Sequence, residues 1–174
     1  MKEIELTQGQ VALIDDEDEA LVRSYGKWTA FKPLNTFYAQ TRIPGDHKKL
    51  VLMHRLIMGL TDPSIGCDHR DGNGINNQRE NLRVATGSQN QGNQRPRKGA
   101  SSRYKGVSWY RRYHKWEGRI EHQGHSYHLG YLDDEADAAR AYDDAARELF
   151  GEFACVNFPR GDERPALPQE TADG

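Results

Sequence analysis

One stretch of the chain joins a polar loop to two short strands. Residues 66–90 begin with an apolar lead into Asp68 and His69, pass through a loop rich in Gly and Asn, and reach the strand-like run 81–86. Gly, Asn and Asp tolerate tight or left-handed backbone, so residues 71–77 are predicted to form an ordered loop. A Ser that can cap a helix follows. These 25 residues therefore predict strand, loop, strand and helix, a unit too small to hold a core alone.

The polar side chains of this stretch suit phosphodiester hydrolysis. That reaction needs a water molecule activated by loss of a proton and relief of the charge on the phosphate. A histidine can take a proton near neutral pH, and His69 is the candidate. Asp68 and Asn90 provide one carboxylate and one neutral oxygen, which suit a single Mg²⁺ (or Mn²⁺) with open coordination positions. Asn81 is expected to brace the loop through its amide.

The local pattern also has a plainer interpretation. An Asp-His pair is common by chance, and Asn-rich loops are most often simple turns. Adjacent residues on a regular strand point to opposite faces, so Asp68 and His69 can serve one site only if the strand ends or bulges there. We expect such an interruption.

The whole string resembles a known family. Asp-His, then Asn-Leu-Arg-Val-Ala-Thr, then Ser-Gln-Asn-Gln-Gly-Asn is similar to HNH endonucleases, and especially to the phage and intron-encoded homing type. The resemblance implies a ββα-metal motif over about residues 64–94, with His69, Asn81 and Asn90 as its three signature residues and Asp68 as a metal ligand. It implies a site-specific, metal-dependent DNA endonuclease. One active site per chain predicts that a monomer nicks one strand.

Charge is distributed unevenly along the chain. The net charge is −2, but residues 21–132 contain nineteen Lys or Arg and only seven acidic residues, while both ends are acidic. This basic segment is where a phosphate backbone would bind. Hydrophobic content of 36% indicates small cores, and no apolar run approaches the roughly 18 residues of a membrane helix. We expect a cytoplasmic protein of a bacterial or phage-infected cell. The two cysteines predict neither a zinc site nor a disulfide framework.

The N-terminal part, residues 1–94, is predicted to be one nuclease domain. Strand-like runs alternate with turns up to a short helix that begins near His54, and an acidic run at residues 15–18 is interpreted as a solvated helix start rather than a metal site. Arg55 either contacts a phosphate or braces the scaffold. Residues 95–102 form a basic linker, in which Arg95, Arg97 and Lys98 are expected to follow the DNA backbone; a plain tether is the alternative.

Residues 103–160 show a second pattern. Alternating runs predict three strands, with Trp116 and Ile120 on one face, and an Ala-rich segment predicts a helix that covers this face. Tyr-Lys-Gly-Val, Trp-Glu-Gly-Arg-Ile, Leu-Gly-Tyr-Leu and Asn-Phe-Pro make the segment resemble the plant ethylene-response-factor (Apetala-type) DNA-binding domain. The resemblance implies a three-stranded sheet in the major groove of double-stranded DNA.

The face away from the helix is expected to contact DNA. Its predicted DNA-contacting residues are Lys105, Ser108, Tyr110, Arg111, Arg112, Lys115, Arg119 and His128. Several of these stand where the plant pattern has arginine, so the plant target sequence does not carry over. Trp116 is interpreted as a core residue, and Trp109 stays ambiguous.

The predicted fold class is α+β. It comprises a small mixed scaffold with the ββα-metal motif, a basic linker, and a three-stranded antiparallel sheet packed on one helix; residues 161–174 are expected to be disordered. The alternative function is a transcriptional regulator that binds DNA and retains an inactive HNH fold. An RNA-binding protein fits less well, because the deep groove of an RNA duplex excludes a sheet.

Overall fold

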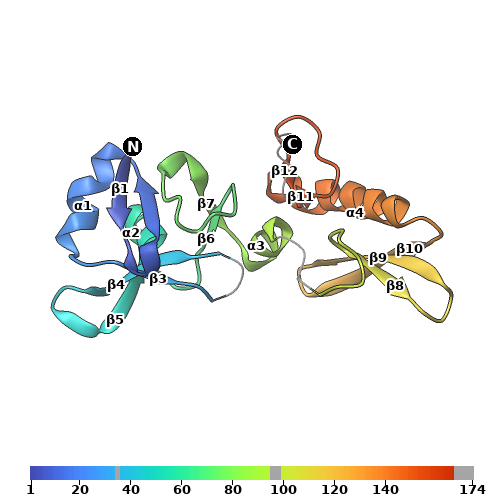
Figure 1. The fold of residues 1–174 in the computed structure, drawn as a ribbon, viewed down its shortest axis with the longest axis horizontal. Coiled ribbons are helices and arrows are strands. Elements are labelled where there is room, and N and C mark those ends of the chain that lie inside the picture. The colour runs from blue at the N-terminus through green and yellow to red at the C-terminus, as the bar shows by residue number, and fades with distance from the viewer. Residues whose placement is uncertain (34–35, 95–98, 167–174) are drawn as a thin grey trace. The chain divides into compact units, whose positions relative to one another are not determined.

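The computed structural model describes residues 1–33, 36–94 and 99–166. The fold is mixed α+β, with several small sheets that are mostly antiparallel and with few helices (Figure 1). The chain forms two compact units, Met1–Thr86 and Gly87–Gly174. Among the described residues, no helix is long and apolar enough to span a membrane.

The first unit consists of short elements. In chain order these are β1 (Lys2–Glu5), η1 (Thr7–Gly9), β2 (Val11–Ile14), η2 (Asp16–Asp18), α1 (Glu19–Ser24), β3 (Thr29–Phe31), β4 (Tyr38–Ile43), β5 (Asp46–Leu52), α2 (Met53–Ile57), β6 (Gly66–His69), η3 (Arg79–Asn81) and β7 (Leu82–Ala85). Strand β1 pairs with β2, the strands β3, β4 and β5 form a second antiparallel sheet in that order, and β6 pairs with β7.

A single apolar cluster holds these small sheets together. Its fully buried members include Ile14 of β2, Val22 of α1, Trp28 just before β3, and Met53 of α2. The indole N–H of Trp28 donates to the carbonyl oxygen of Val22 at 2.9 Å, so the buried ring leaves no polar atom unpaired.

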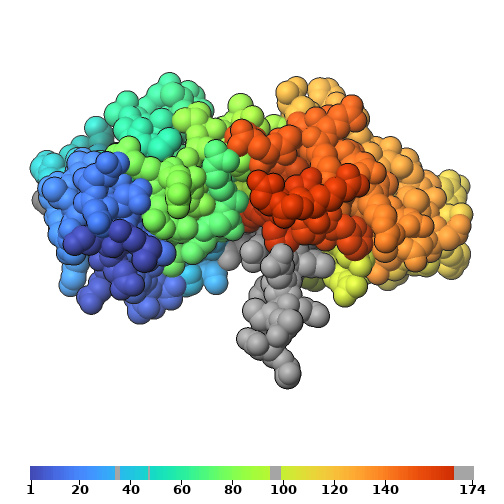
Figure 2. Space-filling view, turned by 90° about the horizontal axis from the view of Figure 1, so that it is seen from above, coloured from blue at the N-terminus to red at the C-terminus, as the bar shows by residue number. Residues whose placement is uncertain are grey.

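The second unit has one sheet and one long helix. Its elements are α3 (Gly87–Asn93), β8 (Val107–Tyr110), β9 (Lys115–His122), β10 (His125–Leu132), α4 (Glu135–Phe150), η4 (Gly151–Phe153), β11 (Cys155–Val156) and β12 (Arg164–Pro165). The sheet order is β10-β9-β8, all antiparallel, and α4 lies on one face of it (Figure 1). In Figure 2 the second unit is seen from the helix side, so α4 and the residues after it, in orange and red, form much of the visible surface.

Small residues allow α4 to approach the sheet closely. Ala138, Ala139 and Ala146 are fully buried, as the Ala-rich pattern predicts. Gly106, just before β8, has a φ of +74°, and a Cβ there would lie 1.9 Å from the ring of Tyr142. Only glycine fits this position, because both the backbone conformation and the space exclude a side chain.

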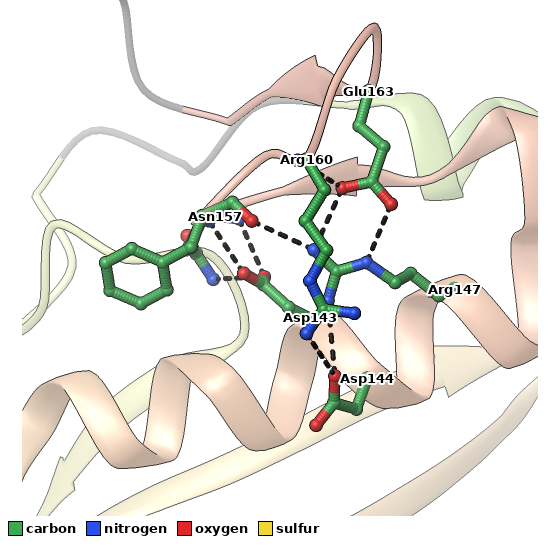
Figure 3. A network of polar contacts seen from close by, with 7 residues as sticks. Asp143, Asp144, Arg147, Asn157, Arg160 and Glu163 are labelled. Atoms are coloured by element: carbon green, nitrogen blue, oxygen red, sulfur yellow. Dashed lines mark hydrogen bonds and ion pairs between the residues drawn. The ribbon is translucent and has the colours of Figure 1, made fainter.

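A polar network closes the C-terminal end of the second unit (Figure 3). The carboxylate of Asp143, fully buried on α4, accepts hydrogen bonds from the backbone N–H groups of Asn157 and Phe158, both at 2.7 Å. Arg147 forms two hydrogen bonds with Glu163, at 2.7 and 2.9 Å. These contacts hold the segment after β11 against α4.

Two boundaries differ from those predicted. Helix α3 was expected with the nuclease domain, whereas the compact units divide after Thr86, because Gly92 of α3 lies against the ring of Phe150 on α4. The predicted disordered tail begins at residue 161, yet Arg164–Pro165 form β12 and Ala166 is buried. The ion pair between Arg147 and Glu163 holds this segment against α4, and amino-acid composition alone does not predict such a pair. Residues 167–174 lie outside the described residues.

We predict that Asp143→Asn destabilises the second unit. The introduced amide N–H₂ would face a backbone N–H that needs an acceptor, so the free energy of unfolding should fall by about 2 kcal/mol or more. Asp144→Asn is the control: its carboxylate is exposed and pairs only with exposed or partly exposed arginines, so the loss should stay below about 1 kcal/mol. Urea denaturation followed by circular dichroism measures both. Equal losses would contradict the role assigned to Asp143.

Candidate functional site

Strands β6 and β7 present the candidate residues in regular antiparallel register. Asp68 lies opposite Arg83, and His69 lies opposite Leu82. Strand β6 ends at His69, where the polar loop begins. The strand thus ends where an interruption was expected, and the two adjacent residues have different surroundings.

Asp68 is half of a buried ion pair. Its Oδ2 accepts hydrogen bonds from Nε and Nη2 of Arg83, at 2.9 and 2.8 Å. Both side chains are less than a tenth exposed. An unpaired carboxylate would be costly at this depth, so Arg83 stabilises the charge of Asp68. The sequence did contain a signal for this contact, namely opposite charges at facing positions of two predicted strands.

His69 lies in a buried group of rings and one amide. Its Nε2 is 3.2 Å from Oδ1 of Asn77. The ring of His54 meets it edge-on at a centroid distance of 5.0 Å, and the ring of Tyr38 does so at 5.8 Å. Only 4% of His69 is exposed. The imidazole is therefore held in one orientation by contacts on several sides.

Asn77 forms hydrogen bonds through both its side chain and its backbone. Its Nδ2 donates to the carbonyl oxygen of Ile75 at 3.2 Å and to Sδ of Met53 at 3.4 Å, and its backbone N–H donates to the carbonyl oxygen of Leu13 at 2.7 Å. With both amide hydrogens directed elsewhere, Oδ1 faces His69. Sequence reasoning did not distinguish Asn77 from the other asparagines of the loop, because only burial separates them.

His54, on α2, is buried as a neutral imidazole. Burial, together with the nearby charges of His69 and Arg55, lowers its pKa to about 3. Its Nδ1 has no hydrogen-bond partner among the described residues. The ring of His54 thus contributes packing to the group around His69 rather than a hydrogen bond.

Asn81 holds the polar loop in place. Its Oδ1 accepts from the backbone N–H of Asp71 at 3.0 Å, and its Nδ2 donates to Oδ1 of Asp71 at 3.0 Å and to the carbonyl oxygen of Asn76 at 2.7 Å. These bonds join the two ends of the loop. The expected bracing role agrees with these contacts.

The acidic run next to α1 binds the far end of the same loop. Asp18, only 2% exposed, accepts hydrogen bonds from Nε and Nη2 of Arg79 at 2.9 and 2.6 Å. Asp15 accepts from the backbone N–H of Arg79 at 2.8 Å. The interpretation as a solvated helix start is therefore wrong for Asp18, because a long-range arginine partner cannot be read from the local sequence.

Asn90 belongs to α3, in the second unit. Gln91 on the same helix donates to Glu121 at 2.7 Å, and Lys105 donates to the carbonyl oxygen of Gly92. Within the described residues, no group of three or more His, Cys, Asp or Glu side chains is gathered as a metal site. The pairing of Asp68 with Asn90 around a metal stays a prediction.

The predicted DNA-contacting cations differ in their surroundings. Arg55 donates to the carbonyl oxygens of Leu60, Asp62 and Ile65, which is the bracing role; its contact with a phosphate stays a prediction. Arg95, Arg97 and Lys98 lie outside the described residues.

Lys105 does not lie on the outer sheet face as expected. It precedes β8, its Nζ donates to the carbonyl oxygen at the end of α3, and burial lowers its pKa to about 8. The prediction assumed that the alternation of β8 continues back to Lys105. It does not, because the backbone turns at Gly106, where φ is positive.

The sheet face away from α4 has the composition that alternation predicts, with one addition. Ser108 and Tyr110 lie opposite Glu117 and Lys115 on this face, and Arg111 and Arg112 are exposed at the hairpin. Trp116, on the other face, packs against the core as predicted. A β-bulge between His128 and Gly130 shifts the phase of β10 and turns Tyr131 outward, opposite Glu117. The Leu-Gly pair inside a strand was the available signal for that bulge.

Comparisons with known proteins relate the chain to two kinds of protein. An AP2-like ethylene-responsive transcription factor of Arabidopsis thaliana is 45% identical over 69 residues, which are 40% of this chain and 14% of the plant protein. The chain thus spans about a seventh of the length of that relative. A protein of Acanthamoeba polyphaga mimivirus that is named as an HNH endonuclease is 36% identical over 102 residues, 59% of this chain and 52% of the viral protein.

These matches support both family resemblances over part of the chain. Protein 3.8 of Escherichia phage T7 is 34% identical over 87 residues, 50% of this chain and 71% of the phage protein. The chain therefore belongs to the same family as Protein 3.8. No family model matches the chain, and no solved structure matches it.

We predict that His54 makes the first unit sensitive to acid. The folded state keeps His54 neutral down to a pKa of about 3, whereas the unfolded chain binds a proton at the ordinary value near 6.5. Stability from this group is thus fully present above pH 6.5 and is lost as the pH falls toward 3. His54→Phe should flatten this part of the profile of unfolding free energy against pH. His114→Phe, which changes an exposed histidine, is the control; a profile that His54→Phe leaves unchanged would contradict the prediction.

Proposed function

We propose that this protein is a site-specific, metal-dependent DNA endonuclease of the homing type, in which His69 is the general base and the second unit binds double-stranded DNA. The observation that carries the proposal is the hydrogen bond between His69 and Asn77 in a buried group of rings. A buried imidazole held by an amide is arranged as a catalytic base is, with its orientation set before substrate arrives. The names of the viral relative and of the plant relatives support the two halves of the proposal.

The contact with Asn77 selects one tautomer of His69. An amide oxygen only accepts hydrogen bonds, so Nε2 of His69 carries the proton and donates it to Oδ1 of Asn77. The other ring nitrogen, Nδ1, is then the basic atom. It would take the proton of the water molecule that attacks phosphorus, and the bond to Asn77 would steady the imidazolium that results.

The donor chemistry of Asp68 and Asn90 fits one Mg²⁺ or Mn²⁺, because a carboxylate and an amide oxygen are hard ligands. When bound, such an ion relieves negative charge on the phosphate and on the leaving oxygen. Arg83 holds the carboxylate of Asp68 in place through two hydrogen bonds. Asn81 keeps the polar loop, and with it the end of β6, in place.

The second unit would supply binding to double-stranded DNA. Exposed Arg111 and Arg112 would contact phosphates, and Ser108, Tyr110 and His128, on the sheet face away from α4, would face the groove. Lys115 pairs with Asp133, and Arg119 pairs with Glu117. Contact with a DNA phosphate would therefore require each cation to leave its carboxylate partner. One catalytic histidine per chain implies that a monomer nicks one strand.

A second function is favoured by one specific observation. The same carboxylate that would hold the metal, Asp68, is already bound by Arg83 in a buried pair. A DNA-binding transcriptional regulator with an inactive nuclease fold could retain such a pair for stability alone. The names of the plant relatives are in keeping with this alternative.

We predict that His69→Ala abolishes nicking of supercoiled DNA in Mg²⁺. Loss of the general base should lower the rate at least about 100-fold, and EDTA should stop the wild-type reaction. The substrate is a phage genome library in supercoiled plasmids, which offers many sequences. His125→Ala removes an exposed histidine outside the candidate site and is the control. Cleavage that survives His69→Ala would reject His69 as base, and binding without cleavage by the wild type would favour the regulator.

Asn77 should act as a positioning residue. Asn77→Leu removes the acceptor for His69 and should lower the nicking rate by about 10- to 100-fold while salt-sensitive DNA binding persists. Asn77→Asp keeps an acceptor oxygen facing His69 but loses both donor contacts of Nδ2, so it should restore part of the rate at a lower thermal midpoint than the wild type. Rates are therefore compared below the thermal midpoints of both variants. Equal loss of rate in both variants at a temperature where both are folded would contradict the assigned role.

A further inference from the structure

The outer face of the second unit is centred on aromatic rings. The side chains that alternate with the helix-facing Val107, Gly118 and Ile120 form the opposite face. Four of the rings at this face touch one another, and together they are called the aromatic cluster: Tyr110, Tyr113, His128 and Tyr131.

The rings of the aromatic cluster are in close mutual contact. Tyr131 lies at its centre, with centroid distances of 4.8 Å to Tyr110, 4.9 Å to Tyr113 and 4.4 Å to His128. The interplanar angles of these pairs are 36°, 85° and 53°. Rings inclined in this way do not form one flat surface. Tyr113 keeps half of its surface exposed.

The charged side chains next to the aromatic cluster form ion pairs, Arg119 with Glu117 and Lys115 with Asp133. Oε1 of Glu117 accepts from Arg119 at 3.1 Å and from Nδ1 of His128 at 3.2 Å, and Glu117 is only 8% exposed. Partial burial raises the pKa of Tyr131, so its hydroxyl stays protonated. Further cations lie at the hairpin: Arg111 is exposed, and the guanidinium of Arg112 lies 5.6 Å from the ring of Tyr113.

Cations beside an apolar centre suit the major groove of a duplex. The arginines can contact phosphates, while the rings meet the base edges. The apolar group that base edges offer there is the C5-methyl of a pyrimidine, and contact with it is a recognised means of readout. This combination of rings and cations therefore favours methyl groups in a duplex. Stacking of unpaired bases on an exposed ring, such as that of Tyr113, is the alternative, which titration of single strands tests.

We propose that the aromatic cluster makes the second unit prefer DNA duplexes whose pyrimidines carry a C5-methyl group, namely thymine or 5-methylcytosine. This inference rests on the proposed binding of double-stranded DNA by the second unit. It names the specificity determinants of that binding as the rings of Tyr113 and Tyr131, the latter placed by the bulge in β10.

The test compares duplexes that differ only in the methyl group. Full-length protein in EDTA, which prevents cleavage, is titrated by fluorescence anisotropy onto alternating d(AT) and d(AU) duplexes, and onto d(GC) duplexes with cytosine or 5-methylcytosine. Affinity for the methylated member of each pair should be higher by about fourfold for each methyl group that becomes buried. The single strands are titrated in parallel.

Matched variants locate the effect. Tyr113→Ser changes an exposed hairpin residue and cannot disturb the core; Tyr131→Ser tests the centre of the cluster. Both should bring the methylated duplexes down to the affinity of their unmethylated partners. Tyr127→Ser is the control, because Tyr127 is similarly exposed but lies opposite Ile120, on the other face.

The outcomes separate this inference from the proposed function. Duplex binding without a methyl preference, or a preference that both cluster variants retain, overturns the inference and leaves DNA binding standing. Tighter binding of single strands than of any duplex overturns it in favour of base stacking. Failure to bind any nucleic acid overturns both the proposed role of the second unit and the inference that rests on it.

Discussion

The orientation of His69 depends on one buried amide. Asn77 accepts from the imidazole through Oδ1, donates to the loop and to Met53 on α2 through Nδ2, and is tied to β2 through its backbone N–H. Three parts of the first unit thus converge on a residue that is only 1% exposed. Because each bond is made in a region closed to water, loss of any partner would leave a buried polar group unpaired. The loop, α2 and the histidine are therefore ordered together, and the arrangement of the candidate base is a property of the core rather than of the loop alone.

The ion pair of Asp68 and Arg83 sets a second constraint. Burial of a carboxylate demands compensation, and Arg83 provides it with two hydrogen bonds to one oxygen. The pairing joins β6 to β7 whether or not a metal binds. The same local structure is therefore compatible with the proposed nuclease and with the alternative regulator.

In the second unit, small residues on α4 let the helix pack closely on one sheet face. Gly106 and the buried alanines bring the backbones close, while Tyr142 and Phe150 of α4 are buried beside them. On the outer face the bulge in β10 brings Tyr131 among the other rings. This face has rings at its centre and arginines at the hairpin, whereas the plant pattern has arginine at several of the positions on the sheet.

The sequence by itself determined the order of the main elements, the α+β class, the Ala-rich helix on a three-stranded sheet, and the polar loop that follows Asp68 and His69. These follow from local periodicity and turn chemistry, which act over a few residues. Only the tertiary structure decided that Asn77 is the partner of His69, that Arg79 captures Asp18, that Lys105 turns inward, and that residues after β11 fold back on α4. Each of those outcomes depends on burial and on contacts between residues far apart in the chain, and neither quantity is expressed in the local pattern of side chains.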